Sequence, residues 1–432
     1  MRLIFSDNMR VLILGSGGRE HALAWVAKKS DKSTKVFIAP GNGGTGEVGE
    51  NVNLDPKNFD QVADFVKDHN IDLVVVGPED PLVMGIVDFF ERDERTSNIP
   101  IFGPNKEAAQ LEGSKAFAKK FMARHDIPTA SYREFTDNDV DEAKAYLMEK
   151  GAPIVLKADG LAAGKGVRVC FTTEEALAAL EDILLDKKYG NAGARVVIED
   201  FLDGIELSVF AICDGRNYVL LPTAKDYKRI GEGDTGLNTG GMGAISPVPF
   251  AGAELMGKIK NRVIEPTING LQSDGIDYKG FLYFGLISVG GDPYVIEYNC
   301  RMGDPETEAV LPRVKTDLLP VMEAAAKGAL NVDSLLVRDE AATTVILVSG
   351  GYPEAYEKGK SITGISAQDE SIVFHAGTKI TDNGLVTNGG RVLALTSFDA
   401  NPKKALERSY QLAESIDFDG KYYRSDIGFD IL

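Results

Sequence analysis

The chain has 432 residues, of which 44% are hydrophobic and 26% charged, as in a soluble globular protein with about three domains of roughly 150 residues. Its net charge of −18 and the absence of a long Lys/Arg run argue against a nucleic-acid partner, whose phosphates it would repel. No apolar run approaches the roughly 18 residues of a membrane span, no signal-peptide pattern is present, and Cys170, Cys213 and Cys300 form no CxxC pair. We therefore expect a cytoplasmic protein that binds neither nucleic acid nor membrane.

The N-terminal residues 10–39 read as a strand, a glycine turn, a helix and a second strand, which is how a doubly wound α/β domain begins. Glu20 stands where a dinucleotide-binding turn needs its third glycine, and the second strand ends in Pro40-Gly41-Asn42 instead of an acidic residue. The pattern therefore weighs against a nicotinamide cofactor. An anion at the start of the helix remains possible from the sequence, because unpaired N–H groups gather there.

The stretch PIVLKADGLAAGKGV, residues 153–167, predicts a buried strand that ends at Lys157 and a glycine-rich loop that follows it. Gly160, Gly164 and Gly166 free the backbone to approach a ligand closely, and Lys165 lies among them. Ammonium and backbone N–H groups together suit a polyanion such as a nucleotide phosphate chain. Taken alone, the segment also fits an ordinary hairpin turn with solvated lysines.

Two later segments carry further polar groups at strand ends. The strand 195–198 leads into EDFLDGIE, where backbone groups near Glu199 and Leu202 suit an adenine edge and Glu206 suits ribose hydroxyls. A hairpin of 281–289 and 294–301 is expected to place Glu297, Asn299 and Arg301 on one face. The oxygen donors suit Mg²⁺ held partly by nucleotide phosphates, and the guanidinium suits an oxyanion, although a solvent-facing polar strand is the alternative.

The remaining segments are less specific. Residues 223–247 are rich in Gly, Asp and Lys and read as a long connection, which in a compact domain is usually functional or disordered. Beyond residue 332 the chain reads as a separate β-rich α+β domain without a catalytic constellation, so we expect it to cover the site.

Six motifs in order, GSGGREHALAW, LEGSKAF, KADGLAAGKGV, IEDFLDGIELS, NTGGMGAISP and VIEYNCRMGDPETE, closely resemble the phosphoribosylamine–glycine ligase family of the ATP-grasp superfamily. The resemblance covers nearly the whole chain. It implies an N-terminal doubly wound parallel-sheet domain in residues 1–104, an ATP-grasp core in 105–332 with a small lid subdomain at about 122–193, and a C-terminal β-rich α+β domain in 333–432.

The resemblance also implies which residues hold each ligand. The expected ATP contacts are Lys115, Lys157, Gly160, Gly164, Lys165, Gly166, Glu199, Leu202 and Glu206, and the expected Mg²⁺ or Mn²⁺ ligands are Glu297 and Asn299. Lys157 and Arg301 are expected to act in catalysis. The expected contacts to the two small-molecule substrates, glycine and 5-phosphoribosylamine, are Gly17, Gly18, Arg19, Asn42, Glu79, Asn238, Gly240, Gly241 and Arg301.

The implied reaction joins glycine to 5-phosphoribosylamine through a glycyl phosphate, giving glycinamide ribonucleotide, ADP and phosphate in de novo purine (IMP) biosynthesis. Such catalysis depends on positioning and charge stabilisation, so no nucleophilic triad is needed. The resemblance implies a monomer. Two alternatives stay open: another ATP-grasp ligase of carboxylase or peptide-ligase type, which would lack GSGGREHALAW and NTGGMGAISP, and a nucleotide sensor without turnover.

Overall fold

The computed structural model describes residues 9–161, 166–186, 193–366 and 368–432. The N-terminal part is a parallel five-stranded sheet in the order β3-β2-β1-β4-β5, as the alternation of strands and helices predicts. Its strands are β1 Met9–Gly15, β2 Ser33–Pro40, β3 Glu50–Asn51, β4 Leu73–Val76 and β5 Ile101–Phe102. Its helices are α1 Gly18–Lys29, α2 Phe59–Asp68, α3 Glu79–Met84 and α4 Ile86–Arg92.

A central antiparallel sheet in the order β11-β10-β16-β17 follows. Alternate residues of β10 pack into two hydrophobic cores, with Leu207 and Val209 in one and Phe210 and Ile212 in the other, so both faces of the sheet are covered. The elements are β10 Ile205–Asp214, β11 Tyr218–Leu220, β16 Lys279–Val289, β17 Asp292–Asn299, α5 Gln110–Gly113, α6 Lys115–Arg124, α9 Ala253–Ile259, α10 Glu265–Ser273, α11 Glu306–Val310 and α12 Leu318–Ala326.

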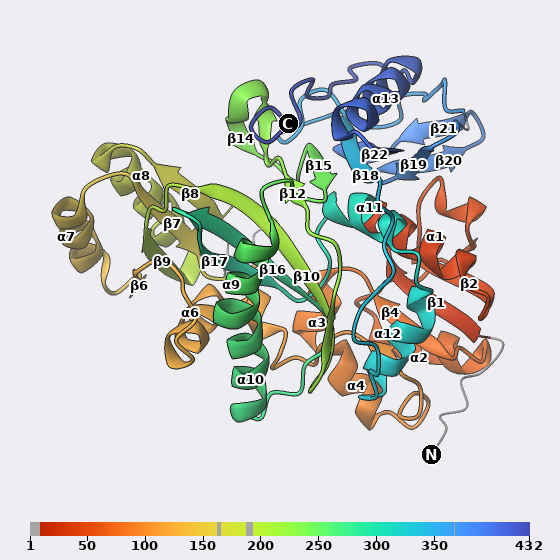
Figure 1. Ribbon diagram of the computed structural model, residues 1–432, viewed down its shortest axis with the longest axis horizontal. Coiled ribbons are helices and arrows are strands. Elements are labelled where there is room, and N and C mark those ends of the chain that lie inside the picture. Colours follow the sequence, from red (N-terminus) through yellow and green to blue (C-terminus); the bar gives the residue numbers. More distant parts are fainter. Residues whose placement is uncertain (1–8, 162–165, 187–192, 367) are drawn as a thin grey trace.

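A small separate sheet in the order β6-β9-β7-β8 carries the predicted lid (Figure 1). Two helices, α7 and α8, bury their apolar side chains against it and enclose a core of their own. The strands are β6 Tyr132–Thr136, β7 Ile154–Ala158, β8 Val167–Cys170 and β9 Arg195–Asp200, and the helices are α7 Val140–Lys150 and α8 Thr173–Leu184. Because β9 pairs with both β6 and β7, this sheet continues past the expected lid end near residue 193.

The C-terminal sheet has the order β12-β15-β18-β22-β19 and packs against α13, and Figure 1 shows it above the N-terminal sheet. Two of its strands, β12 and β15, come from the segment 223–247, so this long connection contains regular structure. The bounds are β12 Lys225–Asp226, β13 Arg229–Gly231, β14 Thr235–Asn238, β15 Gly243–Ser246, β18 Ala341–Val348, β19 Ser371–His375, β20 Thr378–Thr381, β21 Gly384–Thr387, β22 Arg391–Asp399 and α13 Pro402–Ser415.

Candidate nucleotide and substrate site

A buried ion cluster lies where the lid meets the central part of the chain. Glu199, near the end of β9, is bracketed by two lysines: its Oε1 is 2.9 Å from Lys157 Nζ, and its Oε2 is 3.2 Å from Lys119 Nζ. Lys157 also donates to the main-chain oxygen of Ile296, 2.9 Å away, and so joins the lid to β17. The three charged side chains are almost completely buried. Two cations and one anion leave a local excess of positive charge, which suits a polyanionic ligand.

The start of α6 is held against the glycine loop of the lid. Asp159 accepts hydrogen bonds from Ala116 N at 3.1 Å and from Ser114 Oγ at 3.0 Å, and a carboxylate at a helix N-terminus is favourable. Lys115 Nζ donates to Gly160 O at 3.0 Å. Burial lowers the pKa of Lys115, and the nearby Glu297 carboxylate opposes that shift.

The structure therefore brings together Lys115, Lys157, Gly160 and Glu199. Gly166 closes the loop through its carbonyl, which accepts from Ala158 N at 2.9 Å. Two further expected phosphate contacts, Gly164 and Lys165, lie outside the described residues.

The expected ribose contact, Glu206, is the second residue of β10 and pairs with a lysine that was not predicted from the sequence. Lys228 Nζ donates to Glu206 Oε2 at 2.7 Å and to Asp226 Oδ1 at 3.1 Å. The charge of Lys228 lowers the pKa of the Glu206 carboxyl and outweighs the effect of burial. Leu202 lies half-buried in the connection between β9 and β10.

The hairpin β16–β17 places Glu297 opposite Gly285 and Asn299 opposite Tyr283. A Cβ at Gly285 would lie 3.0 Å from Glu297 Cγ, so the glycine leaves room for the carboxylate side chain. The pairing shifts between Gly285 and Leu286, which is opposite Val295, so Ile296 is an extra residue in a bulge. The bulge precedes Glu297, so the register from Glu297 to Asn299 is continuous and these two side chains lie on one face as expected.

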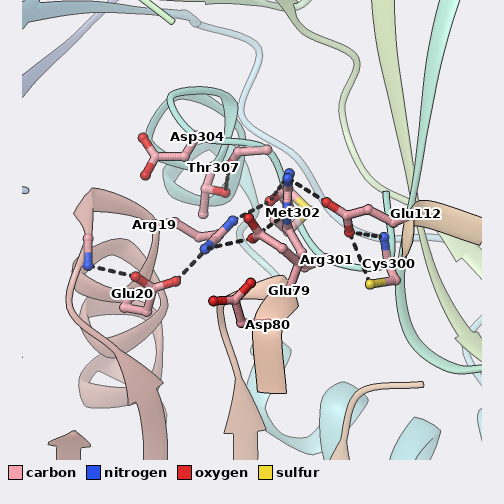
Figure 2. A network of polar contacts seen from close by, with 12 residues as sticks. Arg19, Glu20, Glu79, Asp80, Glu112, Cys300, Arg301, Met302, Asp304 and Thr307 are labelled. Carbon is pink, nitrogen blue, oxygen red and sulfur yellow. Dashed lines mark hydrogen bonds and ion pairs between the residues drawn. The ribbon is translucent and has the colours of Figure 1, made fainter. Parts of the chain in front are cut away.

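Arg301 lies two residues beyond the end of β17, not within the strand as expected, and it joins carboxylates from two other elements (Figure 2). Its Nη2 is 2.6 Å from Glu112 Oε1, and its Nε donates to Glu79 Oε2 at 3.2 Å. Its Nη1 donates to Met302 O at 3.2 Å, and Arg19 Nη1 donates to the same oxygen at the same distance.

Glu79 is the carboxylate shared by both guanidinium groups, since Arg19 Nη2 is 3.9 Å from its Oε2. Burial alone would raise the pKa of Glu79, but Arg301 and Arg19 lower it to about 2. One pair of guanidinium groups therefore brings together three segments that are distant in the sequence: the α1 turn, the start of α3 and the end of β17. Such a pair suits a carboxylate or phosphate oxygen of a substrate.

Glu20, which stands in place of the third glycine of a dinucleotide-binding turn, is used within the turn before α1. Glu20 Oε2 accepts from Gly17 N at 2.6 Å, and Glu20 Oε1 is 2.6 Å from Arg19 Nε. A Cβ at Gly15 or Gly77 would collide with this carboxylate, so the Glu20 side chain occupies the space above both strand ends. Gly17 lies between this carboxylate and the polar loop after β17, since its Cβ would lie 3.0 Å from Glu20 Oε2 and 3.3 Å from Asp304 Oδ2, and a Cβ on Gly18 would collide with Glu308 of α11.

Asn42 has its side chain fully engaged by the protein. Its Nδ2 donates to Ser16 O at 2.9 Å and to His375 O at 2.7 Å, and its Oδ1 accepts from Gly44 N at 2.9 Å and Thr45 N at 3.2 Å. The structure thus gives Asn42 a role in joining the N-terminal turn to the end of β19. A substrate contact through this side chain would have to displace one of these bonds.

The NTGG segment meets an arginine of the C-terminal domain. Arg391 Nη1 donates to Gly240 O at 2.6 Å and is 3.1 Å from Asp304 Oδ1. Gly241 packs against Pro305, where a Cβ would lie 2.4 Å from its Cδ. Asn238, at the end of β14, is half-buried on the same segment. The C-terminal domain therefore contributes a charged side chain to the site, which the sequence reading did not foresee.

Several polar residues at the site were missed from the sequence. One signal was available, because Lys119 follows Lys115 by four positions and so lies on the same face of α6. The spacing of Glu306 gave no such signal. In the structure, burial raises the pKa of its carboxyl to about 7, and Asp226 adds to the shift. The missed residues are Glu112, Lys119, Asp226, Lys228, Glu306 and Arg391.

Among the described residues there is no group of three or more His, Cys, Asp or Glu side chains arranged to hold a metal ion. Glu297 and Asn299 offer one carboxylate and one amide oxygen, a sparse set that fits a cation completed by phosphate oxygens and water. The three cysteines are buried free thiols. No helix of the described ranges has the length and apolar character needed to cross a bilayer.

A small lid sheet, a central antiparallel sheet and a buried lysine cluster between them define an ATP-grasp protein. Family models described as phosphoribosylglycinamide synthetase N domain, ATP-grasp (A) domain and C domain match residues 9–112, 113–307 and 342–430. The chain belongs to the phosphoribosylglycinamide synthetase family.

Individual relatives agree with this membership. Phosphoribosylamine–glycine ligases of Vibrio parahaemolyticus and Pasteurella multocida are each 50% identical to the chain, over 98% of this chain and 98% of theirs. A crystal structure of phosphoribosylamine–glycine ligase from Thermotoga maritima aligns with a TM-score of 0.83 and 38% identity, covering 96% of this chain and 99% of that one. The biotin carboxylase domain of a Hydrogenobacter thermophilus carboxylase, at 16% identity and a TM-score of 0.73, shares the fold alone, over 96% of this chain and 91% of that one.

Proposed function

We propose that this chain carries out the reaction for which its relatives are named, the ATP-dependent joining of glycine to 5-phosphoribosylamine, between the lid and the central sheet. The chain is an ATP-grasp ligase of purine biosynthesis, and its products are glycinamide ribonucleotide, ADP and phosphate. The observation that carries this function is 50% identity to a phosphoribosylamine–glycine ligase over 98% of both chains. Lys115, Lys157 and Glu199, which lie close together where the lid meets β17, support it.

The chemistry needs a carboxylate to become an electrophile. A glycine carboxylate oxygen attacks the γ-phosphorus of ATP, the bond to the bridging oxygen breaks, and ADP leaves. The amine of phosphoribosylamine then attacks the carbonyl carbon of the glycyl phosphate, phosphate leaves, and the nitrogen loses a proton. Each step develops negative charge on oxygen, so fixed cations with good geometry supply most of the catalysis.

We assign the residues to these steps as follows. Lys115, Lys157 and the loop from Gly160 to Gly166 hold the phosphates, because Lys157 is buried beside Glu199, Lys115 reaches the loop at Gly160 O, and the three glycines let the backbone approach a ligand closely. Glu199, Leu202 and Glu206 contact the nucleoside. Arg301 faces the oxyanion that develops during transfer: Met302 O, Glu79 and Glu112 take three of its five N–H groups, which leaves two for a substrate.

Glu297 and Asn299 would hold Mg²⁺, or Mn²⁺, which offsets the phosphate charge when bound. We place the substrates among Gly17, Gly18, Arg19, Asn42, Glu79, Asn238, Gly240, Gly241 and Arg301. At Asn42 and Gly240 a substrate would have to replace existing bonds, because Asn42 N donates to Thr45 Oγ1 at 2.7 Å and Gly240 O accepts from Arg391 Nη1 at 2.6 Å.

We further propose domain limits of 1–104, 105–332 and 333–432, a monomeric state and a cytoplasmic location. Separate sheets in the three parts support the limits, with β12 and β15 as strands that the middle part lends to the C-terminal sheet. Buried free thiols are compatible with a reducing compartment.

The test is ADP release from the full chain with ATP and Mg²⁺. Release should need both glycine and phosphoribosylamine, because the acyl phosphate has to be shielded from water until the amine arrives. Fast release with glycine alone would contradict a sequestered intermediate. No release with all three substrates would refute the ligase function and favour a nucleotide sensor, and release with a different acceptor would favour another ATP-grasp ligase.

A further inference from the structure

The buried pair of lysines around Glu199 is asymmetric, and the asymmetry indicates which of them moves. Lys119 Nζ has three acceptors, Glu199 Oε2 at 3.2 Å, Thr129 Oγ1 at 2.7 Å and Ala130 O at 3.4 Å, which match its three N–H groups. Lys157 Nζ has one, Ile296 O at 2.9 Å, while Glu199 Oε1 lies at the same distance as an ion-pair contact and accepts no hydrogen bond. Lys157 therefore has an N–H group to offer a ligand, whereas Lys119 is committed to the protein.

We propose that Lys119 is a positioning residue for nucleotide binding: it keeps Glu199 charge-paired and oriented while Lys157 turns towards the phosphates. This inference rests on the proposed ATP site, in which Lys157 contacts phosphate. Lys119 itself touches no ligand, since its three N–H groups stay on Glu199, Thr129 and Ala130.

Charge balance in a dry environment gives Lys119 this role. Glu199 has an exposed fraction of 4%, so the carboxylate would be strongly destabilised if its last cation left. With Lys119 in place, moving Lys157 from carboxylate to phosphate leaves one ion pair intact at Oε2 and frees only Oε1. Without Lys119, the same movement would leave a buried anion without a counterion, so Lys157 would remain on Glu199 and the phosphates would lose a cation.

The freed oxygen has a consequence for base selection. Glu199 lies near the end of β9, at the place proposed for the adenine, and its Oε1, which accepts no hydrogen bond in the structure, becomes open to the base as Lys157 leaves. A carboxylate oxygen suits the exocyclic amino group of adenine and repels the carbonyl oxygen of guanine. Lys119 would thus support both affinity for ATP and discrimination against GTP.

Burial lowers the pKa of Lys119 to about 8, although Glu199 opposes the shift and Lys157 adds to it. The other titratable group facing Lys119 is Tyr132, whose ring centroid is 5.5 Å from Nζ and whose pKa burial raises. Because phosphate binding favours the protonated lysine, ATP affinity should fall as the pH rises through about 8. An arginine at position 119 would not lose its proton in this range.

The experiment compares Lys119→Met and Lys119→Arg with the wild-type chain, and uses Lys120→Met as a matched control. Lys120 is the adjacent lysine of α6, and its side chain is 57% exposed and pairs with Glu134 on the surface. Calorimetry would give the affinity for a non-hydrolysable ATP analogue with Mg²⁺ between pH 7 and 9.5, and competition would give the affinity for the GTP analogue.

We expect Lys119→Met to weaken binding of the ATP analogue at least about tenfold at pH 7, to reduce the preference over the GTP analogue, and to remove the pH dependence near 8. Lys119→Arg should bind at pH 7 within a few-fold of wild type, with the decline near pH 8 absent. Lys120→Met should follow wild type in every respect. If Lys119→Met fails to fold, the comparison of Lys119→Arg with wild type across pH decides the question.

Two results would overturn the inference. One is a Lys119→Met chain that binds both analogues as wild type does. The other is a decline near pH 8 that persists in Lys119→Arg, since it would then belong to Lys115, whose pKa burial also lowers. A wild-type chain that binds no ATP analogue would instead refute the proposed nucleotide site, so the two failures are distinguishable.

Discussion

Glu297 is the only charged member of the proposed metal pair, and it lies opposite a glycine that leaves room for it. Glu297→Gln keeps the shape of the side chain and removes the charge. We expect turnover to fall about 100-fold, equivalent to about 2.7 kcal/mol in activation free energy, with little change in the melting temperature. Steady-state kinetics over a range of Mg²⁺ concentrations would test this.

Glu254→Gln is the matched control, because Glu254 has an 89% exposed side chain near the start of α9. It should leave turnover and Mg²⁺ dependence unchanged. A fully active Glu297→Gln enzyme would rule out this carboxylate as a metal ligand.

Arg301 combines contacts that no lysine could reproduce. Its guanidinium meets Glu79, Glu112 and Met302 O in three directions at once, and a single ammonium nitrogen cannot hold the same geometry. Arg301→Lys should therefore lower kcat at least about tenfold while the KM for ATP changes little, because the ATP phosphates are assigned to other cations. Initial rates with each substrate varied in turn would separate these terms, and an effect confined to the KM for ATP would place Arg301 at the nucleotide instead.

At the scale of elements, the buried strands with clear boundaries could be predicted from sequence. β1, β4, β7 and β18 are such strands, because each contains an uninterrupted apolar run. The family resemblance correctly indicated an N-terminal doubly wound sheet and an ATP-grasp core. The strand β10 was not predicted, although IELSVFAICD is largely apolar.

The elements that could not be predicted depend on distant partners. β12 and β15 are two and four residues long, and they exist because β15 pairs with β18, about 100 residues later in the chain. Their own composition, rich in glycine and charge, favours a loop. The bulge at Ile296 is likewise set by the pairing with β16, and so are the contacts of Arg391, which depend on how three domains pack.

The junction of α6 with the end of β7 links helix stability to ligand binding. Asp159→Ala would remove the acceptor for Ala116 N and Ser114 Oγ, and we expect a loss of about 1 kcal/mol in the free energy of unfolding. The KM for ATP should rise as well, because Lys115 and Gly160 lose their fixed relative position.

Asp139→Ala is a suitable comparison for this element. Asp139 accepts from Thr136 N at 3.0 Å and from Thr136 Oγ1 at 2.7 Å, so a similar pair of bonds is lost in the lid but without contact to Lys115. Chemical denaturation and ATP titration of both variants would separate the two effects. Equal changes in KM would show that the junction acts only through lid stability.

At the scale of the whole molecule, the N-terminal and C-terminal domains meet at two buried histidines. His21 of α1 accepts from the main-chain N of His375 through Nδ1 at 2.9 Å, and the two rings lie 5.7 Å apart. Burial lowers the pKa of His21 to about 3, and the nearby His375 adds to the shift. Burial also lowers the pKa of His375 to about 4.

These pKa values give the stability a pH dependence with a definite sign. Between pH 6.5, the ordinary histidine pKa, and about 4, the unfolded chain binds protons at these positions and the folded chain does not, so stability decreases as the pH falls. From pH 6.5 to 5 the His21 contribution is about 2 kcal/mol, since each pH unit is worth about 1.4 kcal/mol. His21→Asn offers an amide oxygen as the acceptor and does not titrate. Unfolding of both proteins in urea at pH 7 and at pH 5 should show that the variant loses about 2 kcal/mol less than wild type; an equal loss would mean that His21 is not what makes the interface acid-sensitive.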